Sequence, residues 1–351
     1  MTDDEKYMYR CLQLALNGKG FVSPNPMVGA VIVCNGMIIG EGYHRQYGEP
    51  HAEVNAIASV KDKNLLKQST IYVSLEPCSH YGKTPPCAQL IIDHKIPRVV
   101  IACEDPYPAV SGKGIRMLKD AGIDVIVGIL QQEAQQQNKE FITAQTKGRP
   151  YIYLKWAQTK DGFIDRLKED NEKPSITPIS NNFTQILVHK KRAEIASIMI
   201  GTNTAINDNP SLTTRLWYGK SPIRIILDRQ GRIPASYKIF NDKVYTIIFT
   251  EKFINDTSPN NIEFIHVKFD DNLLQNIFQN LKNRKINSIL VEGGQQLLQS
   301  LIESRFWDEA YIEVSDTEFR QGIEAPIIKG EVMEEDFYKE SRQIHLRPLE
   351  L

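Results

Sequence analysis

Four residues in the first third of the chain are of types that bind a metal and move protons. His51 is followed two residues later by Glu53, and Cys78 and Cys87 are each preceded by a proline. One imidazole and two thiolates form a three-ligand set that suits Zn²⁺ and leaves its fourth position for water. An open zinc ion lowers the pKa of that water towards about 7. We therefore predict His51, Cys78 and Cys87 as zinc ligands.

Glu53 lies at a predicted helix start, where its carboxyl group can face the water without binding the metal. Hydrolytic deamination of an aminopyrimidine needs an activated water and a group that passes protons to the leaving ammonia. A His-x-Glu motif followed by Pro-Cys and a second Cys is typical of zinc deaminases. The typical spacing between the cysteines is two residues, and here it is eight. The alternative is two buried cysteines and a structural histidine, which the proline before Cys78 and the helix start at Cys87 disfavour.

The elements that must position these residues alternate between helix and strand. A mixed sheet covered on both faces is the expected arrangement. The patterns predict strands at 28–33, 37–42, 70–75, 98–103 and 124–128, with helices near 51–60, 87–93, 114–121 and 131–145.

A second α/β segment begins after Gly148 and Pro150, which interrupt the chain. We predict domains at 1–147 and 148–351. The charged stretch 165–178 is expected to be an exposed excursion. Strands are predicted at 151–157, 197–201, 223–227, 244–249, 262–267, 288–291 and 311–314, with helices near 182–194, 273–283 and 295–304.

Composition narrows the classes of function. The chain has 351 residues and a formal net charge of -1, so it lacks the basic excess of a protein that wraps nucleic acid. No apolar run approaches the roughly 20 residues of a membrane span. The acidic N-terminus lacks the pattern of a signal peptide, and the five cysteines do not suggest a disulfide framework. We expect a cytoplasmic protein without nucleic-acid or membrane partners.

The sequence around the predicted metal ligands resembles that of the bifunctional deaminase/reductase family of riboflavin biosynthesis. The eight-residue spacing between the cysteines is itself typical of that family. The resemblance covers nearly the whole chain and implies a cytidine-deaminase-like domain followed by a dihydrofolate-reductase-like domain. The matching stretches are PNPMVG at 24–29, GYH at 42–44, GEPHAE at 48–53 and LEPCSHYGKTPPC at 75–87.

For the first domain, the resemblance implies zinc on the three predicted ligands and Glu53 as the proton shuttle. The implied substrate is a diamino-ribosylamino-pyrimidinone 5′-phosphate. Asn25, His44, His80 and Lys83 match positions that line the family's deaminase pocket. Asn can read a pyrimidine edge, His can donate to a carbonyl or phosphate, and Lys supplies charge for a phosphate. The alternatives are a hairpin histidine at position 44 and a solvated loop lysine at position 83.

In the second domain, a strand ends at a glycine pair that opens a helix. Such a turn lets backbone amides approach a phosphate. Many turns of this kind, however, bind no ligand and only connect a strand to a helix. The resemblance implies NADPH at this turn and Glu292 near the substrate. Matching cofactor positions are Thr204, Asp208, Gly293, Gly294, Gln295, Gln296, Leu297, Leu298, Gln299 and Ser300.

Matching substrate positions in this domain are Lys155, Arg192, Leu212 and Arg215. Two guanidinium groups make physical sense as a phosphate clamp, because each can hold phosphate oxygens in a bidentate fork. The alternative for Arg192 is the solvated helix face that carries two lysines. The implied reaction is hydride transfer from NADPH to the ribose carbon attached to nitrogen. Family members of this kind often pair through the reductase domain, so a homo-oligomer is expected.

The chain departs from the family pattern near the expected nicotinamide site. The family's Trp is replaced by Pro178, and its Ala-Pro segment by Ser315-Asp316-Thr317. An alternative reading is therefore a deaminase whose second domain has lost reductase activity and serves in binding or assembly. A third hypothesis, an RNA-editing deaminase with an RNA-binding domain, is disfavoured by the net charge and the lack of a basic, aromatic-rich stripe.

Overall fold

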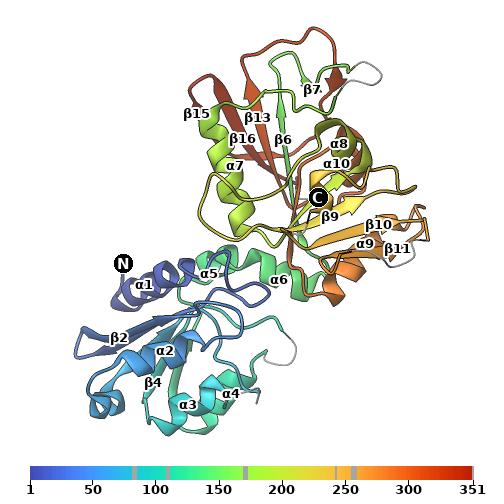
Figure 1. The fold of residues 1–351 in the computed structure, drawn as a ribbon. Coiled ribbons are helices and arrows are strands. Elements are labelled where there is room, and N and C mark those ends of the chain that lie inside the picture. Colours follow the sequence, from blue (N-terminus) through green and yellow to red (C-terminus); the bar gives the residue numbers. More distant parts are fainter. Residues whose placement is uncertain (81–84, 108–110, 169–172, 242, 254–258, 350–351) are drawn as a thin grey trace. The chain divides into compact units, whose positions relative to one another are not determined.

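The computed structural model describes residues 1–351 apart from 81–84, 108–110, 169–172, 242, 254–258 and 350–351. The chain divides into two compact units, Met1–Gly148 and Arg149–Leu351 (Figure 1). Both units are α/β structures, as predicted. Within the described residues, the helices are too short or too polar to cross a membrane.

The first unit is built on a mixed sheet with the strand order β2-β1-β3-β4-β5. β1 is antiparallel to both neighbours, whereas β3, β4 and β5 are parallel to one another. The strands are β1 (Gly29–Cys34), β2 (Met37–Tyr43), β3 (Thr70–Val73), β4 (Arg98–Ile101) and β5 (Asp124–Val127).

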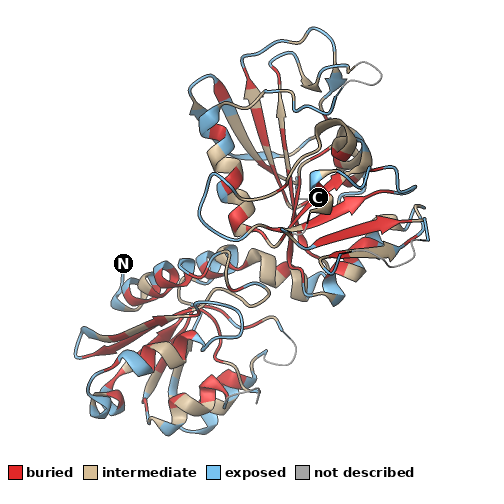
Figure 2. Ribbon diagram, in the orientation of Figure 1, coloured by how far each residue is buried: buried red, intermediate tan, exposed pale blue. Residues whose placement is uncertain are grey.

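Both faces of this sheet are covered, because the side chains of a strand alternate between faces. Ala30 and Ile32 of β1 pack with one group of helices, and Val31 and Val33 pack with the other. The first group is α2 (Ala52–Ser59), η1 (Lys63–Gln68), α3 (Cys87–Asp93) and α4 (Lys113–Asp120); the second contains α1 (Asp3–Leu16) and α5 (Gln131–Gln137). Figure 2 shows the buried residues that run along the strands between these layers.

The predicted single helix at 131–145 is wrong, because α5 ends at Gln137 and, after Asn138, a separate helix α6 (Lys139–Thr146) begins. The Asn138 side chain accepts a hydrogen bond from the Met27 N–H at 2.8 Å and donates one to the Met27 carbonyl at 2.9 Å. This contact spans 111 residues of sequence. A tertiary hydrogen-bond pair therefore interrupts a stretch that is locally compatible with one helix.

The second unit has a larger sheet with the strand order β11-β10-β9-β8-β12-β6-β13-β16-β15. Pairings from β11 to β13 are parallel, and β16 and β15 add an antiparallel hairpin at one edge. The strands are β6 (Tyr151–Gln158), β8 (Ser197–Gly201), β9 (Ile223–Leu227), β10 (Thr246–Thr250), β11 (Ile262–His266), β12 (Ser288–Val291), β13 (Glu309–Ser315), β15 (Glu331–Tyr338) and β16 (Ser341–Arg347).

Helices lie on both faces of this sheet as well. One face packs on α9 (Leu273–Asn283) and α10 (Gln295–Glu303), and the other packs with Ala205 of α8 (Thr202–Asp208). On that second face, Lys191 of α7 (Asn182–Glu194) lies over the rings of Tyr153 and Tyr311. The short η2 (Lys238–Phe240) and a small sheet of β7 (Phe163–Asp165) and β14 (Ile323–Glu324) complete the unit. Parallel strands of this kind place their carboxyl ends at one edge, where ligands usually bind.

Candidate functional site

The predicted zinc ligands of the first unit come together in space. His51 Nδ1 lies 3.6 Å from Cys78 Sγ and 3.4 Å from Cys87 Sγ. All three ligand atoms lie within 4.8 Å of one another. Tetrahedral zinc with Zn–S of about 2.3 Å and Zn–N of about 2.05 Å separates sulfur from nitrogen by about 3.6 Å. The donor set therefore fits a zinc ion in both chemistry and spacing.

Two helix starts and one loop hold these ligands. His51 is the N-cap residue of α2, and Cys87 is the first residue of α3. Cys78 is tied to α3, because the Cys87 N–H donates to its sulfur at 3.3 Å and the Ala88 N–H donates to its carbonyl at 3.1 Å. Hydrogen bonds from Cys87 and His51 lower the pKa of Cys78, so this sulfur is favoured as the thiolate that a metal needs.

Glu53 lies in the first turn of α2 and is 3% exposed. Burial raises its pKa to about 7, against the opposing charge of His51. A carboxyl group with a pKa near neutrality can both accept and donate a proton. Glu53 therefore has the burial and the position that its predicted role requires.

Asn25 and His44 lie next to each other beside His51, one of the predicted ligands. The His44 ring meets the His51 ring edge-on with 5.5 Å between centroids. His44 Nδ1 lies 3.1 Å from the Pro50 carbonyl, and His44 Nε2 lies 3.1 Å from Asn25 Nδ2. A carbonyl only accepts, so Nδ1 carries the proton and Nε2 accepts from the amide. Burial lowers the pKa of His44, which keeps this ring neutral.

The two remaining predicted residues of this pocket are less defined. His80 is exposed, and Lys83 lies outside the described residues. Sequence reasoning gave Glu76 no role beyond its place in the motif. Its buried carboxylate accepts hydrogen bonds from the N–H groups of Asp105, Gly112, Gly114 and Ile115 at 2.9–3.2 Å. Glu76 thereby fixes the loop that leads to Cys78, and only the three-dimensional contacts reveal this.

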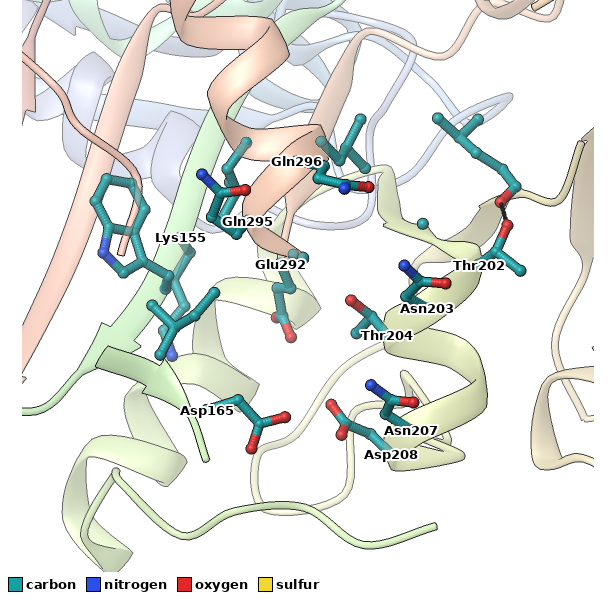
Figure 3. Close-up of a pocket in the computed structure, with 18 of the residues that line it drawn as sticks. Lys155, Asp165, Thr202, Asn203, Thr204, Asn207, Asp208, Glu292, Gln295 and Gln296 are labelled. Atoms are coloured by element: carbon teal, nitrogen blue, oxygen red, sulfur yellow. Dashed lines mark hydrogen bonds between the residues drawn. The ribbon is translucent and has the colours of Figure 1, made fainter. Parts of the chain in front are cut away.

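A pocket of about 1310 Å³ opens in the second unit at the carboxyl ends of its parallel strands. Glu292 follows β12, and Thr202 begins α8 directly after β8. In Figure 3, Glu292, Lys155 and Thr204 point into one space, with Asp165 and Asp208 at its rim. The site thus lies where the sheet topology predicts a ligand.

Arg192 and Glu292 form a two-pronged ion pair in this pocket. Arg192 Nε donates to Oε1 at 2.8 Å, and Nη2 donates to Oε2 at 2.5 Å. Both side chains are about nine-tenths buried, so the solvated alternative for Arg192 is wrong. Burial works to raise the pKa of Glu292, but Arg192 and then Lys155 lower it below its ordinary value. Glu292 is therefore held as a carboxylate.

The glycine turn has the open backbone that a phosphate needs. Gly293 has a φ of 133°, which side-chain-bearing residues rarely adopt, and a Cβ on Gly294 would lie 2.8 Å from Thr204 Oγ1. Thr204 and Asp208 line the pocket from α8. The lining also includes Gly293, Gly294, Gln295, Gln296, Leu297, Leu298 and Ser300.

Gln299 and Leu212 lie away from the pocket lining. Gln299 is on another face of α10, where its side-chain oxygen accepts a hydrogen bond from the Ile327 N–H at 2.9 Å. Leu212 is 3% exposed and packs in a hydrophobic cluster below the loop that carries Arg215. Arg215 and Lys155 both line the pocket.

Several lining residues were not predicted. The stretch expected to be an exposed excursion contributes Asp165 and Thr177 to the pocket, and Lys168 joins it to Asp208 with Nζ 3.0 Å from Oδ1. Pro178 replaces the family's Trp, and it also lines the pocket, as does Trp156 of β6. An aromatic ring is therefore present at the site, supplied by a different element.

Comparisons with known proteins agree over nearly the whole chain. Residues 1–103 match the cytidine and deoxycytidylate deaminase zinc-binding region, and residues 150–315 match the RibD C-terminal domain. The chain is 40% identical over 323 residues to riboflavin biosynthesis protein RibD of Aquifex aeolicus, covering 91% of this chain and 89% of that protein. It is 36% identical to RibD of Escherichia coli, covering 89% and 87%.

Solved structures give the same result. A diaminohydroxyphosphoribosylaminopyrimidine deaminase/5-amino-6-(5-phosphoribosylamino)uracil reductase from Thermotoga maritima matches with a TM-score of 0.88 and 35% identity. RibD of Acinetobacter baumannii matches with a TM-score of 0.90 and 30% identity. Each alignment covers 99% of both chains.

Proposed function

The chain belongs to the RibD family of riboflavin-biosynthesis proteins, and from that premise we propose how its own residues carry out the two reactions. It is a bifunctional enzyme, a zinc-dependent deaminase joined to an NADPH-dependent reductase. Its substrate is a phosphorylated pyrimidine. We propose residues 1–147 as the deaminase domain and 148–351 as the reductase domain. The observation that carries the deaminase assignment is the convergence of His51, Cys78 and Cys87 beside the buried Glu53.

In the deaminase domain, His51, Cys78 and Cys87 hold zinc, and zinc, when bound, supplies Lewis-acid activation of water. Glu53 accepts a proton as water adds to the carbon that bears the amino group. It then donates a proton to the departing ammonia, so it ends the cycle in its starting state. Burial supports this role, since it raises the pKa of Glu53 to about 7.

Asn25 and His44 orient the pyrimidine. Their mutual hydrogen bond and the contact of His44 with Pro50 fix both side chains beside His51. His80 and Lys83 complete the proposed substrate set, with Lys83 supplying charge for the 5′-phosphate.

In the reductase domain, NADPH supplies the hydride, and the protein orients the two reactants. Thr204, Asp208 and the glycine turn hold the cofactor, together with the pocket-facing side of α10. Glu292 and Lys155 face the substrate, and Arg192 keeps Glu292 charged and aligned. Arg215 is free to meet the phosphate, because its guanidinium makes a side-chain hydrogen bond only to Thr213 within the described residues. Leu212 anchors this loop by packing in a buried hydrophobic cluster. Gln299 fixes α10 through its hydrogen bond with Ile327, outside the pocket.

The five cysteines are free thiols in the structure, and two of them are proposed metal ligands. Such thiolates persist in a reducing compartment, which supports a cytoplasmic location. We also propose a homo-oligomer through the reductase domain. The edge strand β15 supports it, because Phe337 is 71% exposed and Val332 is 54% exposed.

One assay tests both activities. The pyrimidine phosphate is incubated with the protein, with and without NADPH, while ammonia release and nicotinamide absorbance are followed. We expect ammonia without NADPH, and NADPH oxidation only after deamination. Glu53→Gln should abolish ammonia release and leave reduction of the deaminated substrate unchanged. Normal ammonia release by Glu53→Gln would rule out the proposed proton shuttle.

A further inference from the structure

His189 of α7 holds the main chain of Arg215 in the reductase domain. The Arg215 N–H donates to His189 Nδ1 at 2.9 Å. A backbone N–H can only donate, so Nδ1 presents a lone pair and the ring proton sits on Nε2. His189 is 5% exposed and lines the pocket. The imidazole is therefore a neutral, buried acceptor that is hydrogen-bonded to the backbone of a proposed substrate-binding arginine.

Burial and two neighbouring positive charges keep the His189 ring neutral. Burial first, and then the neighbouring guanidinium groups of Arg192 and Arg215, lower the pKa of His189 to about 4. The charge of Glu292 and the backbone of Thr213 act in the opposite direction. A protonated ring would lose its acceptor and would add a third cation to the pair of arginines.

The loop that His189 holds needs external support. Asn209 and Leu212 have φ angles of 43° and 50°, in the left-handed region that residues other than glycine rarely adopt. The Arg224 side chain donates to the Ser211 carbonyl at 3.0 Å, and Arg192 donates to the Thr213 carbonyl at 3.4 Å. These contacts fix the loop before Arg215 but not Arg215 itself.

Arg215 is an exposed residue with a long side chain. An unfixed arginine would lose considerable conformational freedom on binding a phosphate. The hydrogen bond to His189 removes part of that freedom in advance, since it fixes the backbone from which the guanidinium extends. His189 lies on α7 one turn before Arg192, so one helix face serves both arginines.

We propose that His189 is a positioning residue that preorganises Arg215 for the phosphate of the reductase substrate. This inference rests on the proposed function, in which Arg215 binds that phosphate. It assigns His189 a role in affinity for phosphorylated substrate, and no part in hydride transfer.

The test is steady-state reductase kinetics with the deaminated pyrimidine in phosphorylated and dephosphorylated form. His189→Ala should raise the KM for the phosphorylated substrate about tenfold, as expected for one hydrogen bond that acts on a charged group. The KM for NADPH and the KM for the dephosphorylated substrate should stay at parental values. His189→Asn should restore most of the affinity, because its amide oxygen can accept from the Arg215 N–H.

A double variant shows whether His189 acts through Arg215. In an Arg215→Ala background, His189→Ala should cause no further rise in KM. Asn182→Ala, at an exposed position on the same helix outside the pocket lining, is the control and should behave as the parent. Unchanged thermal melting and an unchanged KM for NADPH show that the variants are folded.

Two results would overturn the inference while leaving the proposed function intact. One is an equal rise in KM for both forms of the substrate, and the other is an additive effect on top of Arg215→Ala. If Arg215→Ala itself leaves the KM for phosphorylated substrate unchanged, the phosphate role of Arg215 fails, and the inference fails with it.

Discussion

Gly114 packs so tightly on Pro77 that a Cβ at position 114 would lie 2.0 Å from the Pro77 carbonyl oxygen. The Gly114 N–H also donates to the carboxylate of Glu76 at 2.9 Å. Glu76 and Pro77 immediately precede the proposed zinc ligand Cys78. The start of α4 therefore sets the position of a proposed metal ligand that lies on a different segment of the chain.

Gly114→Ala should displace the loop that carries Cys78. Backbone atoms cannot yield 2.0 Å without moving the loop, and displaced outer contacts commonly weaken metal affinity about 10–100-fold. We expect loss of zinc on gel filtration and loss of deamination, with reduction of the deaminated substrate retained. Lys113→Ala, one residue earlier and exposed, is the control. Full zinc retention by Gly114→Ala would contradict this coupling.

Metal removal should separate the two activities. Dialysis against a chelator at neutral pH should abolish ammonia release and spare NADPH oxidation, because the proposed zinc ligands all lie in the first unit. Refilling with Co²⁺ should give thiolate-to-cobalt charge-transfer absorption that Cys78→Ser weakens and Cys34→Ser does not. A cobalt spectrum without thiolate bands would exclude the predicted sulfur ligands.

Removing only one partner of the Arg192–Glu292 ion pair should strongly lower the stability of the protein. Arg192→Met leaves a buried carboxylate without its cation, which typically costs about 3–5 kcal/mol. We expect faster hydrogen exchange of the β12 amides and loss of reductase activity. Arg342→Met removes a surface pair with Glu335, with side chains 47% and 34% exposed, and should cost about 1 kcal/mol or less. Equal effects of the two variants would argue against a special role for the buried pair.

The convergence of the proposed zinc ligands and most strands could be predicted because their signals are local. His51 and Cys87 begin helices that the apolar periodicity marks, and β1 follows an uninterrupted apolar run. The break of the helix at Asn138 could not be predicted, because it depends on a contact with Met27 across the fold. Residues 331–347 received no strand prediction, since β15 is largely exposed and polar and has no alternating buried face.

Side-chain roles in the reductase pocket were less accessible from sequence. The sequence offers Arg192 and two neighbouring lysines on one helix, and only packing shows that Arg192 pairs with Glu292, 100 residues away. His189 carries no motif of its own. Gln299 lies within the matching stretch but faces away from the pocket, because a helix presents consecutive residues in different directions.

Acid should weaken the first unit through Asp4. Arg98 donates to both oxygens of Asp4, at 3.1 and 2.8 Å, and Tyr72 donates at 2.7 Å. The hydrogen bond from Arg98 holds the pKa of Asp4 below its ordinary 3.8, although burial opposes this. A lowered folded-state pKa contributes stability that is present above 3.8 and is lost as the pH falls through the lowered value.

The measurement compares Asp4→Asn with the parent chain in urea melts of the metal-free protein. The parent should be more stable at pH 6, and the difference should shrink below pH 4 as Asp4 takes up a proton. Asp3→Asn, an exposed neighbour in the same helix turn, should show no such convergence. A difference that stays constant from pH 6 to pH 3 would contradict the role of this pair.

Arg224 should support the shape of the substrate loop, although it is not part of the pocket lining. It is fully buried, and it donates to the Ser211 carbonyl at 3.0 Å, the Ile239 carbonyl at 3.2 Å and Asn241 Oδ1 at 3.0 Å. Arg224→Met keeps much of the volume but leaves these acceptors without donors, at about 1–3 kcal/mol for a buried group. Since Ser211 precedes the positive φ of Leu212, the loop should relax and the KM for phosphorylated substrate should rise. Arg342→Met, at an exposed arginine outside the pocket lining, is the control for loss of charge. If Arg224→Met lowers the melting temperature without changing that KM, the side chain supports the fold alone, and the loop before Arg215 is held by its other contacts.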